Sequence, residues 1–155
     1  MGSARAERLP PRDDRGHRLL QVGMLLFLLG LLVGFAVPAL RNPRMGLASH
    51  LEGLLNGLFL LVLGLVWPRL ALGRRASAAL FWLAIYGTVA NWGTTLLAAI
   101  WGAGSRMSLA AGSHRGTVGR ELAIDVLLVT LSIAIVAASV LVLWGLRRPP
   151  TPPER

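Results

Sequence analysis

The fold is decided by the stretch "SHLEGLLNGLFLLVLGLVWP", residues 49–68, in which strongly polar side chains precede an uninterrupted apolar run. From Leu58 to Pro68 there is no charge and no strongly polar group. Such a run has no polar face to turn toward water, so it is typical of a helix that crosses a bilayer. It remains to be explained why this helix carries His50, Glu52 and Asn56 in its first turns.

Three further runs have the same character, and they occupy residues 19–40, 76–102 and 122–146. A helix needs about 20 apolar residues to cross a hydrocarbon core of roughly 30 Å. The first run is longer than the roughly 7–15 apolar residues of a signal peptide, so we expect it to stay as an anchor. The sequence predicts an all-α fold, an integral membrane bundle of four transmembrane helices with spans at about 19–40, 48–67, 76–102 and 121–146.

The two tails differ from this single transmembrane domain, 19–146. Residues 1–18 and 147–155 are basic and contain proline, and both are predicted to be disordered. The chain has no cysteine, which excludes disulfides, thiolate ligands and cysteine nucleophiles.

Arginines predict the orientation in the membrane. Eleven of them lie on the side that holds both termini, and five lie on the other side, at Arg41, Arg44, Arg106, Arg115 and Arg120. Cytoplasmic loops carry the excess of basic residues, so we expect both termini to be cytoplasmic. The net charge of +9 is explained by these juxtamembrane positions, and no nucleic-acid partner is expected.

The second span has two possible starts. Asn42 followed by Pro43 is a good helix start, and Ser49 with Glu52 forms a competing capping box. With the first start His50 lies two turns inside the helix, and with the second it lies at the membrane surface.

Polar residues recur at one depth in three of the predicted spans, and ionisable or amide groups inside a membrane are costly and usually functional. The set comprises His50, Glu52, Asn56, Asn91, Thr95, Glu121 and Asp125. We expect them to line one shared chamber. The alternatives are hydrogen bonds between helices for His50, Asn56 and Asn91, and stabilisation of helix N-termini for the carboxylates.

His50, Gly53 and Gly57 fall on one stripe of the second span at about 100° per residue. The two glycines would leave a smooth wall beside His50 against which a large flat group could lie. The alternative is a seam of small residues that packs two helices together.

The segments "NPRMGLASHLEGLLNG" and "FWLAIYGTVANWGTTLLAAIWG" resemble the hydroxylaminobenzene mutase family of small bacterial membrane proteins. The resemblance implies an isomerase of the bacterial inner membrane that converts hydroxylaminobenzene to 2-aminophenol.

The spacing of His50, Asn56 and Gly57 is also similar to styrene oxide isomerase, a homotrimer that binds haem b. That similarity implies that His50 is the axial ligand of a haem iron and that Asn56 and Asn91 lie in the substrate pocket. Thr95 and Gly87 stand about where that isomerase has a catalytic tyrosine and an aspartate, a difference that favours the mutase over epoxide chemistry.

The resulting hypothesis is an intramolecular hydroxyl transfer on a small aromatic substrate within the lipid bilayer. Asn56 and Asn91 orient the substrate, Glu52 or Asp125 moves the proton, and Thr95 completes the catalytic set. His50, Gly53 and Gly57 hold the haem. The alternatives are an epoxide isomerase, a small membrane exporter that uses Glu52 to couple protons, and an assembly subunit.

Overall fold

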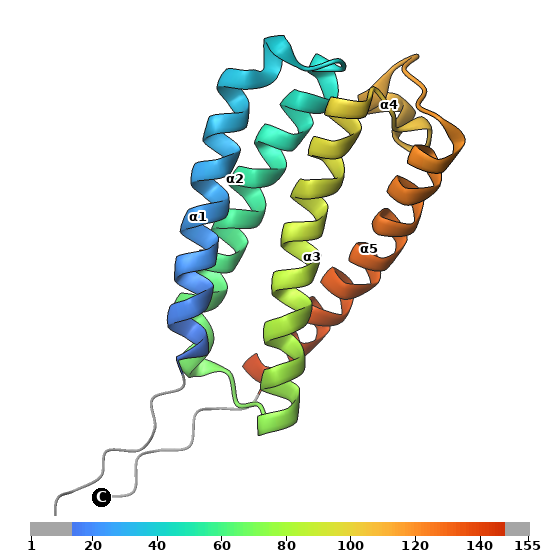
Figure 1. The fold of residues 1–155 in the computed structure, drawn as a ribbon. Helices are drawn as coiled ribbons and strands as arrows, with labels where there is room; N and C mark the ends of the chain where they lie inside the picture. The colour runs from blue at the N-terminus through green and yellow to red at the C-terminus, as the bar shows by residue number, and fades with distance from the viewer. Residues whose placement is uncertain (1–13, 148–155) are drawn as a thin grey trace, which may run out of the picture.

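The computed structural model describes residues 14–147, and within them every regular element is helical (Figure 1). The long helices are α1 (Arg15–Ala36), α2 (Pro43–Val66), α3 (Arg74–Trp101) and α5 (Val118–Leu146). Short elements extend or join them: η1 (Val37–Ala39), η2 (Trp67–Arg69), η3 (Ser105–Met107) and α4 (Ser108–Ala111).

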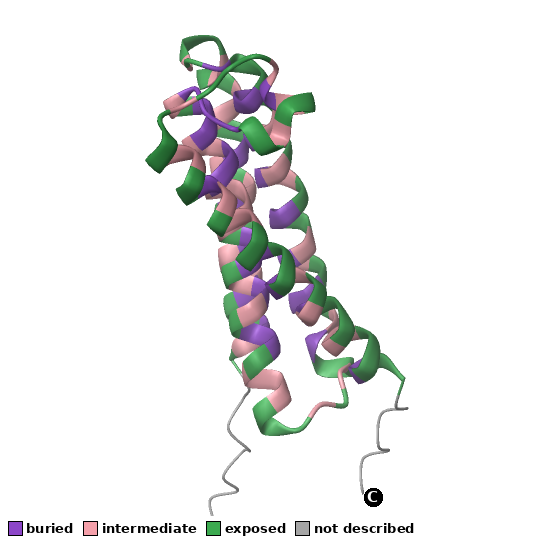
Figure 2. Cartoon of the chain, turned by 90° about the vertical axis from the view of Figure 1, so that its right-hand side faces the viewer, coloured by how far each residue is buried: buried purple, intermediate pink, exposed green. Residues whose placement is uncertain are grey.

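All four long helices are long and apolar enough to cross a membrane, which confirms the prediction of a multi-pass membrane protein. Exposed residues occur along the whole length of the helices (Figure 2). They include large apolar residues such as Phe35, Leu65 and Ile133. Exposure of such an apolar surface to water would be unfavourable, whereas contact with the hydrocarbon core of a bilayer is not.

The helices pack in chain order, α1 on α2, α2 on α3 and α3 on α5. Among the long helices, α5 packs almost wholly on α3, so the arrangement is a row of neighbours rather than a closed four-helix bundle (Figure 1). The α1–α2 link and α4 lie together at one end of the molecule, called the α4 end below. The α2–α3 link lies at the opposite end.

Glycines bring α1 and α2 into close contact. A Cβ atom added to Gly53 would lie 2.5 Å from the Cα of Gly30, and one added to Gly57 would lie 2.8 Å from the carbonyl oxygen of Gly23. Backbone therefore packs on backbone, which is how small residues drive helix association where lipid replaces water. This contact fixes the distance between the two helices that carry His50 and its neighbours.

Helix α2 begins at Pro43, which confirms the first of the two predicted starts. Asn42 is the N-cap, and its side-chain oxygen accepts a hydrogen bond from the backbone N–H of Met45 at 3.2 Å. The amide nitrogen of Asn42 also donates to the carbonyl of Ala111 at 2.9 Å, which ties α4 to this helix start. The expected boundary at residue 48 was too late, and Ser49 is not a cap: its hydroxyl donates to the carbonyl of Trp92 on α3 at 3.4 Å.

The predicted tails lie mostly outside the described residues, 1–13 at one end and 148–155 at the other. Within the described residues, α1 begins at Arg15, so residues 15–18 belong to the first span rather than to a tail.

The glycine seam predicts opposite effects for two similar substitutions. Gly53→Ala places a methyl group against the backbone of Gly30, so we expect a loss of about 1–3 kcal/mol of stability, because a tightly packed backbone cannot move aside cheaply. Gly93→Ala on α3 meets nothing within 4 Å and should stabilise the helix by up to about 1 kcal/mol. Thermal unfolding in detergent, followed by circular dichroism, measures both, and equal effects would contradict the seam.

Candidate active site

A carboxylate and two amides meet between α2 and α3. The Glu52 Oε2 atom accepts a hydrogen bond from Asn56 Nδ2 at 2.9 Å and another from Asn91 Nδ2 at 2.5 Å. Asn56 lies one helical turn after Glu52 on the same face of α2, while Asn91 comes from the facing side of α3. These three residues are called the Glu52 cluster below.

The Glu52 cluster lies within the apolar length of both spans. Asn56 is only 7% exposed, whereas Glu52 and Asn91 keep part of their surface accessible. A carboxylate in a membrane span is costly unless polar groups surround it, so two converging amides offset part of that cost. The partial exposure leaves the cluster accessible to a small ligand.

His50 lies on the other side of α2. It lies two positions before Glu52, which corresponds to a rotation of about 200° around the helix axis. The His50 Nδ1 atom lies 2.8 Å from the carbonyl oxygen of Gly30 on α1. A carbonyl only accepts hydrogen bonds, so Nδ1 is the donor, and the lone pair of the neutral ring is on Nε2. A Cβ on Gly34 would lie 2.7 Å from this ring, so that glycine makes room for His50.

An apolar groove of about 430 Å³ runs beside His50 where α1 turns into η1. It is lined by Leu31, Gly34, Phe35, Val37, Pro38, Leu47 and His50. Phe35 is 86% exposed, so the groove opens to the outer surface of the protomer. A flat apolar group with an atom that binds imidazole nitrogen suits this groove.

Gly53 and Gly57 do not line this groove. Both are buried against α1, Gly53 on Gly30 and Gly57 on the backbone of Gly23 and Phe27. The alternative given by their spacing, a packing seam, describes what they do in the structure. Their effect on His50 is indirect, because they set how close α1 comes.

Asp125 lies apart from the Glu52 cluster, at the α4 end. Both of its oxygens face the guanidinium of Arg106, with Arg106 Nε at 2.9 Å and Nη2 at 3.1 Å. This ion pair joins η3 to the first turns of α5. The structure therefore corrects the expectation that Asp125 shares a chamber with the residues of α2 and α3.

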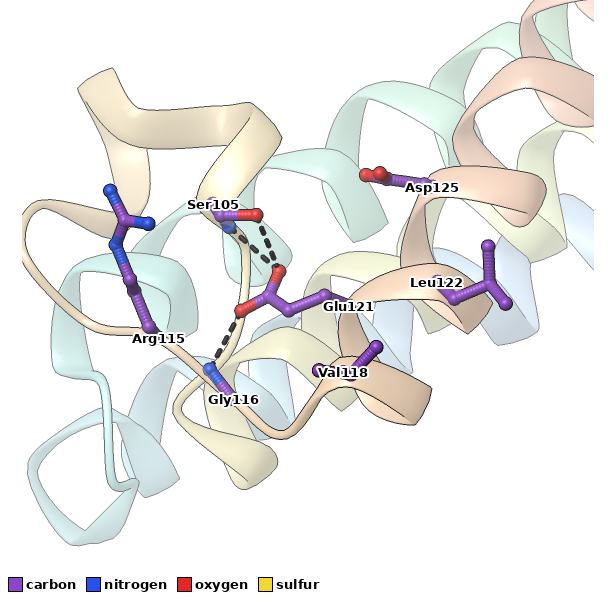
Figure 3. A pocket seen from close by; sticks show the side chains of 7 residues that line it. All are labelled: Ser105, Arg115, Gly116, Val118, Glu121, Leu122 and Asp125. Carbon is purple, nitrogen blue, oxygen red and sulfur yellow. Dashed lines mark hydrogen bonds between the residues drawn. The ribbon is translucent and has the colours of Figure 1, made fainter.

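Glu121 organises the segment that joins α3 to α5. Its carboxylate accepts hydrogen bonds from the backbone N–H groups of Ser105 and Gly116 and from the Ser105 hydroxyl, at 2.7–2.9 Å (Figure 3). It also accepts from the backbone N–H of Gly104, at 3.1–3.2 Å. The pocket beside it, of about 380 Å³, is formed by this link and the start of α5. Glu121 was expected to line the shared chamber, with a place at a helix N-terminus as the alternative. Its carboxylate instead binds the backbone of the α3–α5 link.

Thr95 directs its hydroxyl to its own helix, to the carbonyls of Asn91 at 3.2 Å and Trp92 at 2.9 Å. Thr95 is 5% exposed and lies one helical turn after Asn91. Within residues 14–147 its hydroxyl makes no hydrogen bond to the side chains of the Glu52 cluster. The indole Nε1 of Trp92 is buried and has no hydrogen-bond partner within residues 14–147. Trp92 packs on Gly53, between the cluster and α1.

The polar residues thus occupy three places rather than the single chamber that was expected. Glu52, Asn56 and Asn91 meet between α2 and α3, His50 faces α1, and Asp125 pairs with Arg106 at the α4 end. His50 and Glu52 point to opposite sides of α2, and the apolar groove beside His50 does not include Glu52. Among the described residues no three His, Asp or Glu side chains gather as a metal site.

The fold and the site define a multi-pass membrane protein with an amide–carboxylate cluster inside its spans. Residues 15–147 match the family model for styrene oxide isomerase, and the chain belongs to that family. It is 58% identical to hydroxylaminobenzene mutase HabB of Ectopseudomonas oleovorans over 135 residues, which cover 86% of this chain and 82% of that protein. It is 48% identical to hydroxylaminobenzene mutase HabA of the same organism over 131 residues, 84% of this chain and 97% of that protein. The chain is therefore an isomerase. No solved structure matches it.

Proposed function

We propose that this isomerase is a mutase that rearranges an arylhydroxylamine, such as hydroxylaminobenzene, to 2-aminophenol. The observation that carries the proposal is the Glu52 cluster, in which polar groups from two helices meet inside apolar spans. The two relatives named as hydroxylaminobenzene mutases support the choice of substrate. Because the chain belongs to an isomerase family, we favour an enzyme over the exporter and assembly-subunit hypotheses.

The reaction moves a hydroxyl group within one molecule. The N–O bond breaks, a C–O bond forms at the ortho carbon, the proton on that carbon leaves and the nitrogen gains a proton. Asn56 and Asn91 orient the substrate, and Glu52 accepts and returns the proton, since its carboxylate lies beside both amides whereas Asp125 is held by Arg106. The apolar side chains around the cluster limit the access of water, which would otherwise trap the electron-poor ring.

The groove beside His50 fits a haem. Its lining is apolar, Gly34 leaves space for the imidazole, and the bond from Nδ1 to Gly30 leaves Nε2 as the free ligand atom. His50 would hold the iron, and Leu31, Phe35 and Leu47 would pack on the ring. When bound, a ferric haem supplies a Lewis acid that polarises the oxygen of the substrate.

A homotrimer is supported by the surface of the protomer. Glu52 and Asn91 remain partly exposed within the spans, and the His50 groove opens outward. Lipid tails cannot satisfy a carboxylate or an amide, so a neighbouring protomer that covers these faces would lower their cost. Assembly would also bring the groove of one copy toward the cluster of the next.

The epoxide isomerase alternative has one observation in its favour, the name of the matching family model. Against it, Thr95 at the position of a catalytic tyrosine has its hydroxyl hydrogen-bonded to its own helix.

Membranes that contain the protein should convert hydroxylaminobenzene to 2-aminophenol, measured by chromatography of the products. Asn56→Leu should lower kcat/KM by about 100-fold or more, because it removes a group that orients the substrate. Asp125→Asn should stay within a few-fold of the wild type, because Asp125 lies outside the cluster. No 2-aminophenol from the wild type refutes the proposal, and an equal loss in both variants refutes the assigned site.

Haem binding predicts a Soret absorbance band in protein purified after expression with ample haem. His50→Ala should abolish the band because it removes the ligand nitrogen, and Glu52→Gln, on the other face of α2, should keep it. A wild-type protein without the band would remove haem from the proposal.

We also propose that both termini are cytoplasmic in the bacterial inner membrane. The chain has no cysteine, so single cysteines at two exposed loop positions report the orientation without background. Ser113→Cys at the α4 end should react with an impermeant maleimide added to intact spheroplasts, whereas Ala71→Cys in the α2–α3 link should react only after lysis. The reverse pattern would invert the topology.

A further inference from the structure

The amide of Asn56 can adopt only one orientation. Its Nδ2 atom lies 2.8 Å from the backbone carbonyl oxygen of Glu52 and 2.9 Å from the Glu52 Oε2 atom. An amide NH₂ group has two N–H donors, whereas the amide oxygen only accepts. Turning the amide over would place its oxygen against two acceptor oxygens, so both hydrogen bonds of Nδ2 would be lost and replaced by repulsion between acceptors. The Asn56 Oδ1 atom is therefore fixed on the side away from Glu52.

The same carboxylate oxygen orients the second amide. Asn91 Nδ2 donates to Glu52 Oε2, so the Asn91 Oδ1 atom is likewise directed away from the carboxylate. Within residues 14–147 neither amide oxygen accepts a hydrogen bond. Neither is among the fully buried polar atoms that lack a partner, so both oxygens keep some accessible surface. Glu52 thus occupies donors of both amides and leaves two accessible acceptors from two different helices.

We propose that Glu52 sets the hydrogen-bond polarity of the active site, so that it takes aromatic ligands that carry N–H or O–H donors and rejects those that carry only acceptors. An arylhydroxylamine offers both an N–H and an O–H, whereas an aryl epoxide offers only an acceptor oxygen. This inference rests on the proposed function, which places the substrate at the Glu52 cluster. Glu52 is here a positioning residue, in addition to its part in proton transfer.

The selectivity follows from the cost of an unpaired acceptor. A ligand with donors satisfies Asn56 Oδ1 and Asn91 Oδ1, whereas a ligand without donors displaces water from them and leaves them unpaired. Sites built to hydrogen-bond a donor discriminate against analogues that lack it for this reason. A preference of about tenfold or more is expected.

The test uses two ligands that do not undergo the rearrangement, aniline with its N–H donors and N,N-dimethylaniline without any. Their dissociation constants are measured by calorimetry on the purified full-length protein. The wild type should prefer aniline by about tenfold. Glu52→Gln should keep this preference while slowing turnover of hydroxylaminobenzene, because the glutamine oxygen can accept from both amides but cannot move the proton.

Glu52→Met is the matched variant, similar in length but without an acceptor. It frees the Asn91 amide to turn and present its N–H groups, while Asn56 stays held by the backbone carbonyl of residue 52, so the preference for aniline should fall by about threefold. The two methyl groups of the second ligand are the same in every variant, so the change in the ratio reports the orientation of the amides rather than steric fit. Asn91→Leu gives an independent check, because it removes one acceptor without touching Glu52 and should also reduce the ratio.

Three results would overturn the inference: no preference in the wild type, an unchanged ratio in both Glu52→Met and Asn91→Leu, or a loss in Glu52→Gln as large as in Glu52→Met. If Glu52→Met does not fold, Asn91→Leu and Glu52→Gln decide the matter together: an unchanged ratio in Asn91→Leu, or a lost preference in Glu52→Gln, overturns the inference. Failure of the proposed function has a different readout, which is the absence of 2-aminophenol from the wild type. The ratio of the two dissociation constants can still be interpreted in that case.

Discussion

The contact between Gly30 and Gly53 holds the backbones of α1 and α2 closer together than any side chain would allow. The position of every functional group on α2 depends on this contact. It brings the Gly30 carbonyl within 2.8 Å of His50 Nδ1, and it commits the opposite side of α2 to α3. Glu52 and Asn56 therefore meet Asn91, while His50 faces the groove on α1. One backbone contact thus separates the apolar groove beside His50 from the Glu52 cluster.

The membrane determines the energetic cost of the polar groups in the Glu52 cluster. In water, a carboxylate with two amides would be an ordinary surface feature worth little. Inside an apolar span the same three groups are costly, and each must find a partner. The Glu52 carboxylate accepts from both amides and leaves the acceptor oxygens of Asn56 and Asn91 without a partner among residues 14–147. The α4 end is stabilised differently, by the hydrogen bonds of Glu121 to the backbone of the α3–α5 link and by the ion pair of Asp125 with Arg106.

Sequence reasoning succeeded where a property is local. The four spans follow from apolar run length, and the start of α2 follows from Asn42 and Pro43, although the competing pair Ser49 and Glu52 kept two starts open. It failed where partners come from other helices. Asp125 looked like a member of the active site because its depth matched, yet depth says nothing about direction around a helix axis. Gly53 and Gly57 shared a stripe with His50, but whether that stripe faces a ligand or a neighbouring helix depends on what packs against it.

By itself the sequence determined that this is a membrane protein of four helices with costly polar residues near one end, since hydropathy is a sum over consecutive residues and needs no partner. It also determined that the second helix carries His50, Glu52 and Asn56 within two turns. Only the tertiary structure decided that His50 contacts α1 whereas Glu52 contacts α3, and that Asp125 pairs with Arg106. The physical reason is that hydrogen bonds are short and directional, so they are settled by the rotation and spacing of whole helices, which the close packing of glycines fixes and no single segment encodes.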